Sequence, residues 1–180
     1  EYGILLESTS KANKVDNQAT YITSQKEVTE EARAAMEKQA TDGFNAYISK
    51  SWDDNSKLTE FKYVGSYLLK NKFPERSNNI NTYIMVFEFG CSVDSDGYRG
   101  LTKGYQTFSF KNLIKEDGKV EVDLQSMNTS YNSYSFEVKN DEGNTRNFST
   151  YGFETLEDLY KNQVAANLEN FEYEASDSLK

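Results

Sequence analysis

Between Leu58 and Val138, this chain contains a series of segments in which apolar residues recur at every second position. This is the period of β-strands that bury one face. The segments lie at 58–69, 83–89, 107–111, 120–124 and 134–138. Turn-forming residues follow two of them, at 115–118 (Lys-Glu-Asp-Gly) and 140–144 (Asn-Asp-Glu-Gly-Asn). Consecutive strands joined by short turns predict an antiparallel sheet.

The alternation also predicts which side chains share a face of the sheet. In the densest segment, Ile84, Val86 and Glu88 lie opposite the aromatic positions. The predicted apolar face of the first strand consists of Phe61, Tyr63, Tyr67 and Leu69, and that of the second consists of Tyr83, Met85, Phe87 and Phe89.

Two segments have the period of a helix instead. From Val28 to Ile48, apolar and small residues recur at spacings of three and four, and Ser24-Gln25-Lys26-Glu27 fits a capping box. We expect a long amphipathic helix that ends near Lys50. A second stripe, from Leu156 to Phe171, predicts a C-terminal helix capped by Thr155 and Asp158.

These elements predict an α+β fold in which a long N-terminal helix packs on a curved antiparallel sheet, followed by a C-terminal helix. By analogy, this is the two-layer plan of cystatin-like and NTF2-like proteins. A length of 180 residues favours one domain. We place that domain at 28–174 and expect 1–27 to pack on it as a short helix or edge strand. We expect 175–180 to be a frayed tail.

Composition excludes several classes of function. The chain has no histidine, so it has no imidazole base and lacks the commonest ligand of transition metals. The net charge of −9 opposes binding to nucleic acid and docking on anionic lipid.

The longest apolar run, 83–87, is far too short to insert into a bilayer. The single cysteine, Cys91, cannot form an intramolecular disulfide, and we expect a buried structural thiol.

Two pairs of acidic residues are candidates for chemistry. Asp94 and Asp96 precede Gly97, as in the start of a calcium loop, but the position of the closing carboxylate holds Tyr105. A polar hairpin loop is the alternative reading. Asp53 and Asp54 follow Trp52 and suggest an acid/base pair or an exposed acidic loop. We expect no metal and no cofactor.

Glu88 lies within the most apolar strand. If the carboxyl were buried, its pKa would rise and it could act as a general acid in an NTF2-like pocket. The alternative is that Glu88 faces solvent or pairs with a lysine of a neighbouring strand.

The sheet half of the chain is rich in tyrosines that stand among Asn and Ser. Flat aromatic faces beside amides suit glycans or extended peptides, although tyrosine is also a favoured strand residue. The five candidate binding residues are Tyr98, Tyr105, Tyr131, Tyr134 and Tyr151.

Three motifs of the second half carry a resemblance to a family. They are Asp117-Gly118-Lys119-Val120-Glu121-Val122-Asp123-Leu124 after the Tyr/Phe-rich strand, Tyr151-Gly152-Phe153 before a helix, and the stretch from Asn167 to Glu174. Over 58–174 the chain resembles the extracytoplasmic domains of Gram-positive membrane-anchored proteins, which often carry a zinc ribbon, or of lipoproteins. The chain itself has neither zinc-ribbon cysteines nor an apolar span.

The resemblance implies a cell-surface domain held by an anchor that is absent from this chain. The leading expectation is therefore a non-catalytic cell-envelope domain that binds a cell-wall component, glycan or protein partner through its tyrosines. The rival is an NTF2-like protein that binds a small molecule in a pocket, with Glu88 as the acid of a histidine-free enzyme.

Overall fold

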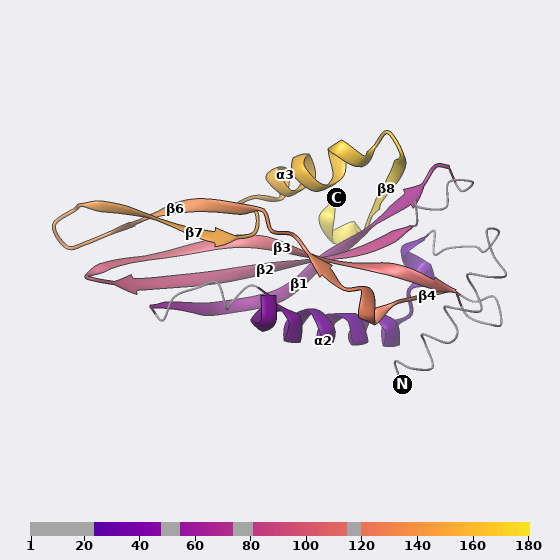
Figure 1. Ribbon diagram of the computed structural model, residues 1–180, viewed down its shortest axis with the longest axis horizontal. Coiled ribbons are helices and arrows are strands. Elements are labelled where there is room, and N and C mark those ends of the chain that lie inside the picture. Colours follow the sequence, from indigo (N-terminus) through magenta and orange to yellow (C-terminus); the bar gives the residue numbers. More distant parts are fainter. Residues whose placement is uncertain (1–23, 48–54, 74–80, 115–119) are drawn as a thin grey trace.

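The computed structural model describes residues 24–47, 55–73, 81–114 and 120–180 (Figure 1). Its helices and helical turns are η1 (Gln25–Glu27), α2 (Glu30–Tyr47), η3 (Leu124–Ser126), α3 (Leu156–Leu159), the π-helical turn η4 (Tyr160–Val164), η5 (Ala165–Asn167) and η6 (Asp177–Leu179). Its strands are β1 (Ser56–Asn71), β2 (Thr82–Ser95), β3 (Tyr98–Ile114), β4 (Val120–Val122), β5 (Asn128–Thr129), β6 (Ser133–Lys139), β7 (Thr145–Tyr151) and β8 (Phe171–Ala175).

The strands form one antiparallel sheet in the order β7-β6-β3-β2-β1-β8, and β4 and β5 also pair with β3. The predicted α+β class and the antiparallel sheet are therefore confirmed. The long strands β1, β2 and β3 lie at the centre (Figure 1). The β6–β7 hairpin joins the sheet through the ladder pair Arg99–Lys139 between β3 and β6. The predicted turn at 140–144 joins β6 to β7, whereas the one at 115–118 lies outside the described residues.

Helix α2 is shorter than predicted. Ser24 does not cap it, because its Oγ accepts from Lys26 N in the separate turn η1, and Val28 is extended. Thr29 caps α2 instead, with its Oγ1 accepting from Ala32 N at 3.1 Å. The helix spans 18 residues from Glu30 to Tyr47, and the predicted end at 48–50 lies outside the described residues.

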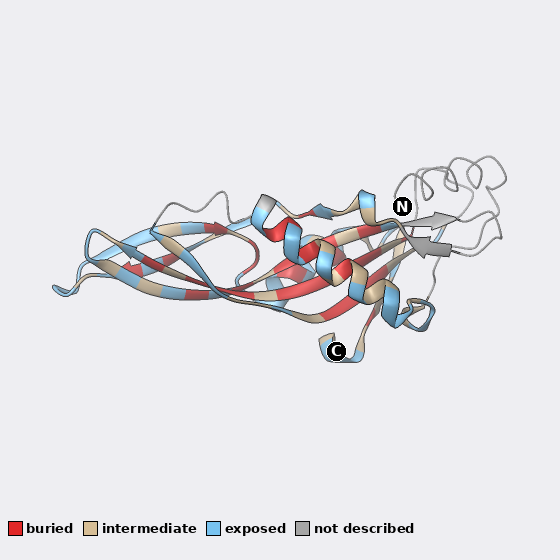
Figure 2. Ribbon diagram, turned by 90° about the horizontal axis from the view of Figure 1, so that it is seen from below, coloured by how far each residue is buried: buried red, intermediate tan, exposed pale blue. Residues whose placement is uncertain are grey.

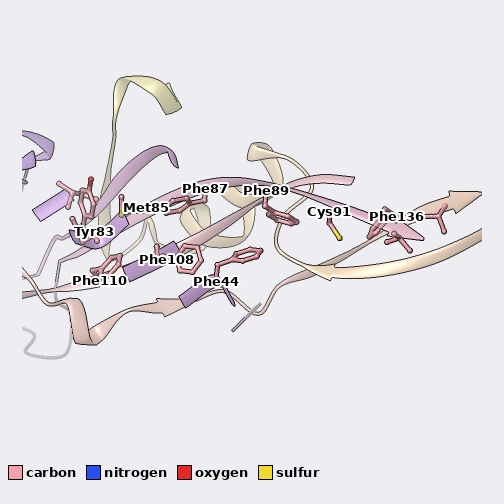
Figure 3. Close-up of a cluster of buried hydrophobic side chains, with 14 residues drawn as sticks. Phe44, Tyr83, Met85, Phe87, Phe89, Cys91, Phe108, Phe110 and Phe136 are labelled. Atoms are coloured by element: carbon pink, nitrogen blue, oxygen red, sulfur yellow. The ribbon is translucent and has the colours of Figure 1, made fainter. Parts of the chain in front are cut away.

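Helix α2 lies across one face of the sheet and turns a buried stripe towards it (Figure 2). The stripe consists of Met36, Ala40 and Phe44, and it packs into an aromatic cluster that we call the α2-side core (Figure 3). Within it, the rings of Phe61 and Phe87 stack with centroids 4.5 Å apart. The prediction that Tyr83, Met85, Phe87 and Phe89 share a face is confirmed. The core continues along β2 to Cys91 and Val93, where Phe136 and Val138 of β6 join it.

The predicted face of β1 is wrong. The pairing of β1 with β2 shifts register between Tyr63 and Gly65, which marks a β-bulge. The extra residue reverses the alternation, because the side-chain period of a strand is two. Phe61 and Tyr63 therefore pack against the α2-side core, whereas Tyr67 and Leu69 belong to a second cluster on the opposite face.

This second cluster, the α3-side core, lies under the C-terminal segment. Tyr67, Ile84 and Val86 of the sheet pack there against Phe153, Leu159 and Val164. The predicted C-terminal helix is present but smaller than expected, and Thr155 caps it as predicted by accepting from Asp158 N. The helix ends in the turns η4 and η5, and Phe171 begins strand β8, which pairs with β1.

The last residues are ordered against the sheet and do not form the frayed tail that we expected. Ala175 ends β8, and Ser176 N donates to Ser66 O at 2.8 Å. The side chain of Leu179 lies so close to Gly65 that a Cβ added there would be 2.6 Å from Leu179 Cγ. The segment thus packs beside the bulge of β1.

Gly152 carries the chain from one face of the sheet to the other. Tyr151 packs against the α2-side core and Phe153 belongs to the α3-side core. The φ angle of Gly152 is 126°, and an added Cβ would lie 2.8 Å from both the Phe89 ring and Tyr105 O. Both the conformation and the space therefore require glycine.

We expect Gly152→Ala to lower the free energy of unfolding by more than about 3 kcal/mol, because it adds overpacking to backbone strain. The matched control is Gly143→Ala, since Gly143 also has a positive φ, of 84°, but nothing within 4 Å of an added Cβ. That change should cost only about 1 kcal/mol. Urea unfolding of both variants measures the difference, and equal losses would contradict this explanation.

Candidate functional site

The sheet face that α3 covers becomes polar further along β1, β2 and β3. Direct cross-strand pairs place its side chains in rows, such as Lys62–Glu88–Tyr105 and Glu60–Gly90–Lys103. We call this surface the charged sheet face. It comprises Lys57, Glu60, Lys62, Glu88, Ser92, Asp94, Arg99, Leu101, Lys103 and Tyr105.

Glu88 lies at the centre of this network. Its carboxylate is 3.3 Å from Lys62 Nζ and accepts a hydrogen bond of 3.3 Å from Tyr105 Oη. Glu60 Oε1 lies 3.4 Å from Lys103 Nζ in the neighbouring row. Burial alone would raise the pKa of Glu88, but the hydrogen bond and charge of Lys62, with hydrogen bonds to Glu60 and Tyr105, lower it below its ordinary value.

This geometry bears on the predicted general acid. Glu88 shares a face with Val86 and so points away from α2, whereas the pocket hypothesis puts it between the helix and the sheet. A carboxyl with a lowered pKa is ionised at neutral pH and holds no proton to donate. The alternative reading, a pair with a lysine of a neighbouring strand, is confirmed.

Asp94 and Asp96 form ion pairs at the β2–β3 hairpin. Asp94 Oδ1 is 3.4 Å from Arg99 Nε, and Asp96 Oδ2 is 3.8 Å from Arg146 Nη1. Asp96 and Gly97 both have positive φ angles, as a tight two-residue hairpin turn requires. Among the described residues, no three His, Cys, Asp or Glu side chains gather as a metal site would require. Asp53 and Asp54 lie outside the described residues.

The five predicted tyrosines do not lie on one face. Tyr105 belongs to the charged sheet face, whereas Tyr98, Tyr134 and Tyr151 pack against the α2-side core. Tyr131 precedes β6 and is 64% exposed.

Two of these tyrosines are held by other side chains. The Arg146 guanidinium lies 4.2 Å from the centre of the Tyr98 ring. Tyr134 Oη is 2.9 Å from Thr102 Oγ1, and burial raises the pKa of the phenol above its ordinary value. Both rings therefore serve packing of the hairpin on the sheet.

The remaining two form a contact that we call the tyrosine pair. The rings of Tyr131 and Tyr151 meet edge to face, with centroids 5.9 Å apart and an interplanar angle of 78°. The backbone beside both rings is fixed, since Gly152 N donates to Asn132 O and Asn132 Nδ2 donates to Gly152 O. The exposed Tyr131 ring thus stands on a second aromatic ring above a tied backbone.

Leu101 is not among the candidate residues that the sequence motifs indicated, although 74% of this residue is exposed. It lies opposite Ser92 on the charged sheet face, two residues from Lys103. The alternation in β3 could have indicated Leu101. This apolar residue shares a face with the charged Arg99 and Lys103, so its side chain does not point into the core. Cys91 is buried in the α2-side core, as expected.

The chain matches no protein-family model, no curated protein and no solved structure. Among the described residues, no helix is long and apolar enough to cross a membrane.

We expect Glu88→Gln to reduce the free energy of unfolding at pH 7 by about 0.5 to 1 kcal/mol, a modest loss because the paired lysine is largely exposed. The pKa of Glu88 is lower in the folded state than in the unfolded state. The ionised carboxylate therefore stabilises the fold fully above the unfolded-state pKa, and this stabilisation is lost as the pH falls through the folded-state pKa. The deficit of the variant should therefore shrink between about pH 5 and pH 3.

Urea unfolding across this pH range measures the effect. Glu172→Gln is the control, since Glu172 is more exposed and lies 3.9 Å from Lys70. If Glu88→Gln were as stable as the unmodified protein at pH 7, or if Glu88 titrated near neutral pH, the stabilising role of this network would be disproved.

Proposed function

We propose that this chain is a non-catalytic, extracytoplasmic domain of the cell envelope that binds a cell-wall glycan through the tyrosine pair. The observation that carries the proposal is the Tyr131 ring, which is 64% exposed and rests edge to face on Tyr151. A sugar ring that stacks on such a surface buries apolar C–H groups without displacing protein contacts. Binding a ligand here would lose little conformational entropy, because Tyr131 is adjacent to Asn132, which hydrogen bonds already hold in place.

The other tyrosines are less suited to this role. Tyr98 lies under Arg146, Tyr134 bonds to Thr102, and Tyr105 donates to Glu88. Each of them would have to break an internal contact to meet a ligand.

The pocket enzyme is the less supported alternative. It needs a carboxyl that keeps its proton at neutral pH, and the pairing of Glu88 with Lys62 lowers the pKa of that group. The absence of histidine from the whole chain also removes the commonest general base.

The cell-envelope location rests on the resemblance of 58–174 to Gram-positive extracytoplasmic domains and fits the net charge of −9. The anchor, in a membrane-anchored protein or a lipoprotein, is part of the same proposal. We also propose a relationship to the cystatin-like or NTF2-like plan, supported by the packing of α2 on a curled antiparallel sheet. The segment α3–η5 on the opposite face adds a third layer to that plan.

A protein partner is the second candidate, and Leu101 is the observation that favours it. This exposed apolar side chain is flanked along β3 by Arg99, which pairs with Asp94, and by Lys103, which pairs with Glu60, as an interface centre is flanked by a polar rim. In this case the contact would be the charged sheet face and not the tyrosine pair.

We expect Tyr131→Ala to weaken binding to protein-free Gram-positive cell walls at least about tenfold, as loss of a central aromatic contact does. Tyr160→Ala is the matched control. Tyr160 is also exposed, at 40%, and also meets a tyrosine edge to face, namely Tyr173 at 5.5 Å. Co-sedimentation of the purified domain with cell walls over a concentration series gives the affinities.

Equal binding by Tyr131→Ala and Tyr160→Ala would overturn the tyrosine-pair proposal. A loss of binding in Leu101→Ser, with Tyr131→Ala unchanged, would also overturn it and would place the contact on the charged sheet face. Absence of any binding by the unmodified domain would contradict the cell-wall function itself.

A further inference from the structure

Strand β7 forms one end of the sheet order, and among the described residues no strand pairs with its outer edge. It pairs with β6 over its full length in one continuous register, from Ser133–Tyr151 to Lys139–Thr145. The backbone groups of its outer edge are therefore available to another strand.

The hydrogen bonds at the two ends of the hairpin show which residues point outward. Asn140 N donates to Asn144 O at one end, and Gly152 N donates to Asn132 O at the other. Bonded and non-bonded pairs alternate in an antiparallel ladder, so the even-numbered residues of β7 bond to β6. The N–H and C=O groups of Thr145, Asn147 and Ser149 are directed away from β6.

The edge of β7 contains no proline, lysine or bulge, three features that usually prevent strand addition. Its one charge, Arg146, lies opposite the buried Val138 and is held by the Tyr98 ring and by Asp96. The opposite edge strand, β8, has only five residues and carries Glu172 and Glu174. Of these two ends of the sheet, β7 is the one suited to strand addition.

We infer that β7 pairs with β7 of a second copy of this chain, antiparallel about a two-fold axis. The strand is complementary to itself. In the register centred on Phe148, Asn147 faces Ser149 of the second copy, and Arg146 faces Thr150, so no like charges are opposed. The residues that meet as hydrogen-bonded pairs in this register are the odd-numbered ones, whose backbone groups point outward. The contact is isologous, as two-fold dimers require.

The charge of the chain predicts how this pairing depends on salt. Each copy carries a net charge of −9, whereas the pairing strand has only the positive charge of Arg146. The bodies of the two copies therefore repel one another, and salt screens this repulsion. Dimerisation should be weak and should strengthen as the ionic strength rises, unlike an interface made by opposite charges.

The test is sedimentation equilibrium of the whole chain from about 10 µM to about 1 mM, at low and high salt. Ser149→Pro removes an outward N–H that has no role in the pairing with β6, so the monomer should tolerate it. Ser149→Ala is the matched control, since both variants lose the 3.3 Å contact with Ser135 Oγ but only proline loses the N–H. We expect the unmodified chain and Ser149→Ala to dimerise, and Ser149→Pro to do so at least tenfold more weakly.

A second variant keeps the test valid if Ser149→Pro fails to fold. Asn147→Lys with Ser149→Lys places lysines opposite one another in the pairing, at positions that are exposed in the monomer. This variant should be monomeric. A monomeric unmodified chain at every concentration would overturn the inference, as would a Ser149→Pro or double-lysine variant that folds and dimerises as well as the unmodified chain.

Discussion

The fold depends on the two apolar faces of β2. Its odd-numbered residues from 83 to 89 form the centre of the α2-side core, and Ile84 and Val86 lie in the α3-side core. Leaving either set in water would cost about 25 cal/mol for each Å² of apolar surface. The chain therefore needs cover on both sides of one strand. Helix α2 and the β6–β7 hairpin cover one side, and α3 with η4 covers the other.

The surfaces available for function are set by where this cover ends. On the α3 side the apolar face stops at Glu88, and the next rows of the sheet carry paired charges with Leu101 among them. On the α2 side part of the cover is the β6–β7 hairpin, which presents Tyr131 beside its base and an edge of β7 that no other described strand pairs with. The candidate surfaces thus belong to the covering elements and to the part of the sheet that they leave uncovered.

Sequence periodicity predicted β1, β2, β6 and part of β3, because alternation is a direct record of burial, whereas β7 and β8 were not predicted. Alternation placed Tyr83, Met85, Phe87 and Phe89 of β2 on the correct face. Applied to the observed span of β3, the same alternation puts Tyr98 and Tyr105 on opposite faces of the sheet. It failed for β1, where one extra residue before Gly65 reverses the faces without changing the composition. A bulge is set by the pairing with β2, which local sequence does not record.

The length of the C-terminal helix was predicted wrongly for a different reason. Leu159 and Val164 are both buried although they are five residues apart, and the π-helical turn η4 between them provides that spacing. After it, Phe171, Tyr173 and Ala175 alternate with two glutamates, a strand signal that the expected helical stripe concealed. The grouping of the tyrosines was the least predictable feature, because partners distant in sequence, such as Thr102 and Tyr134, decide which rings are engaged.

The central claim is that the tyrosine pair is the binding surface of this domain. It is tested most directly by mapping amide chemical shifts of the labelled domain as soluble cell-wall fragments are added. We expect signals of residues 130–133 and 151–152 to move together and saturate, while those of Leu101 and Lys103 remain in place. Shifts confined to the charged sheet face, or none at millimolar fragment concentrations, would contradict the claim.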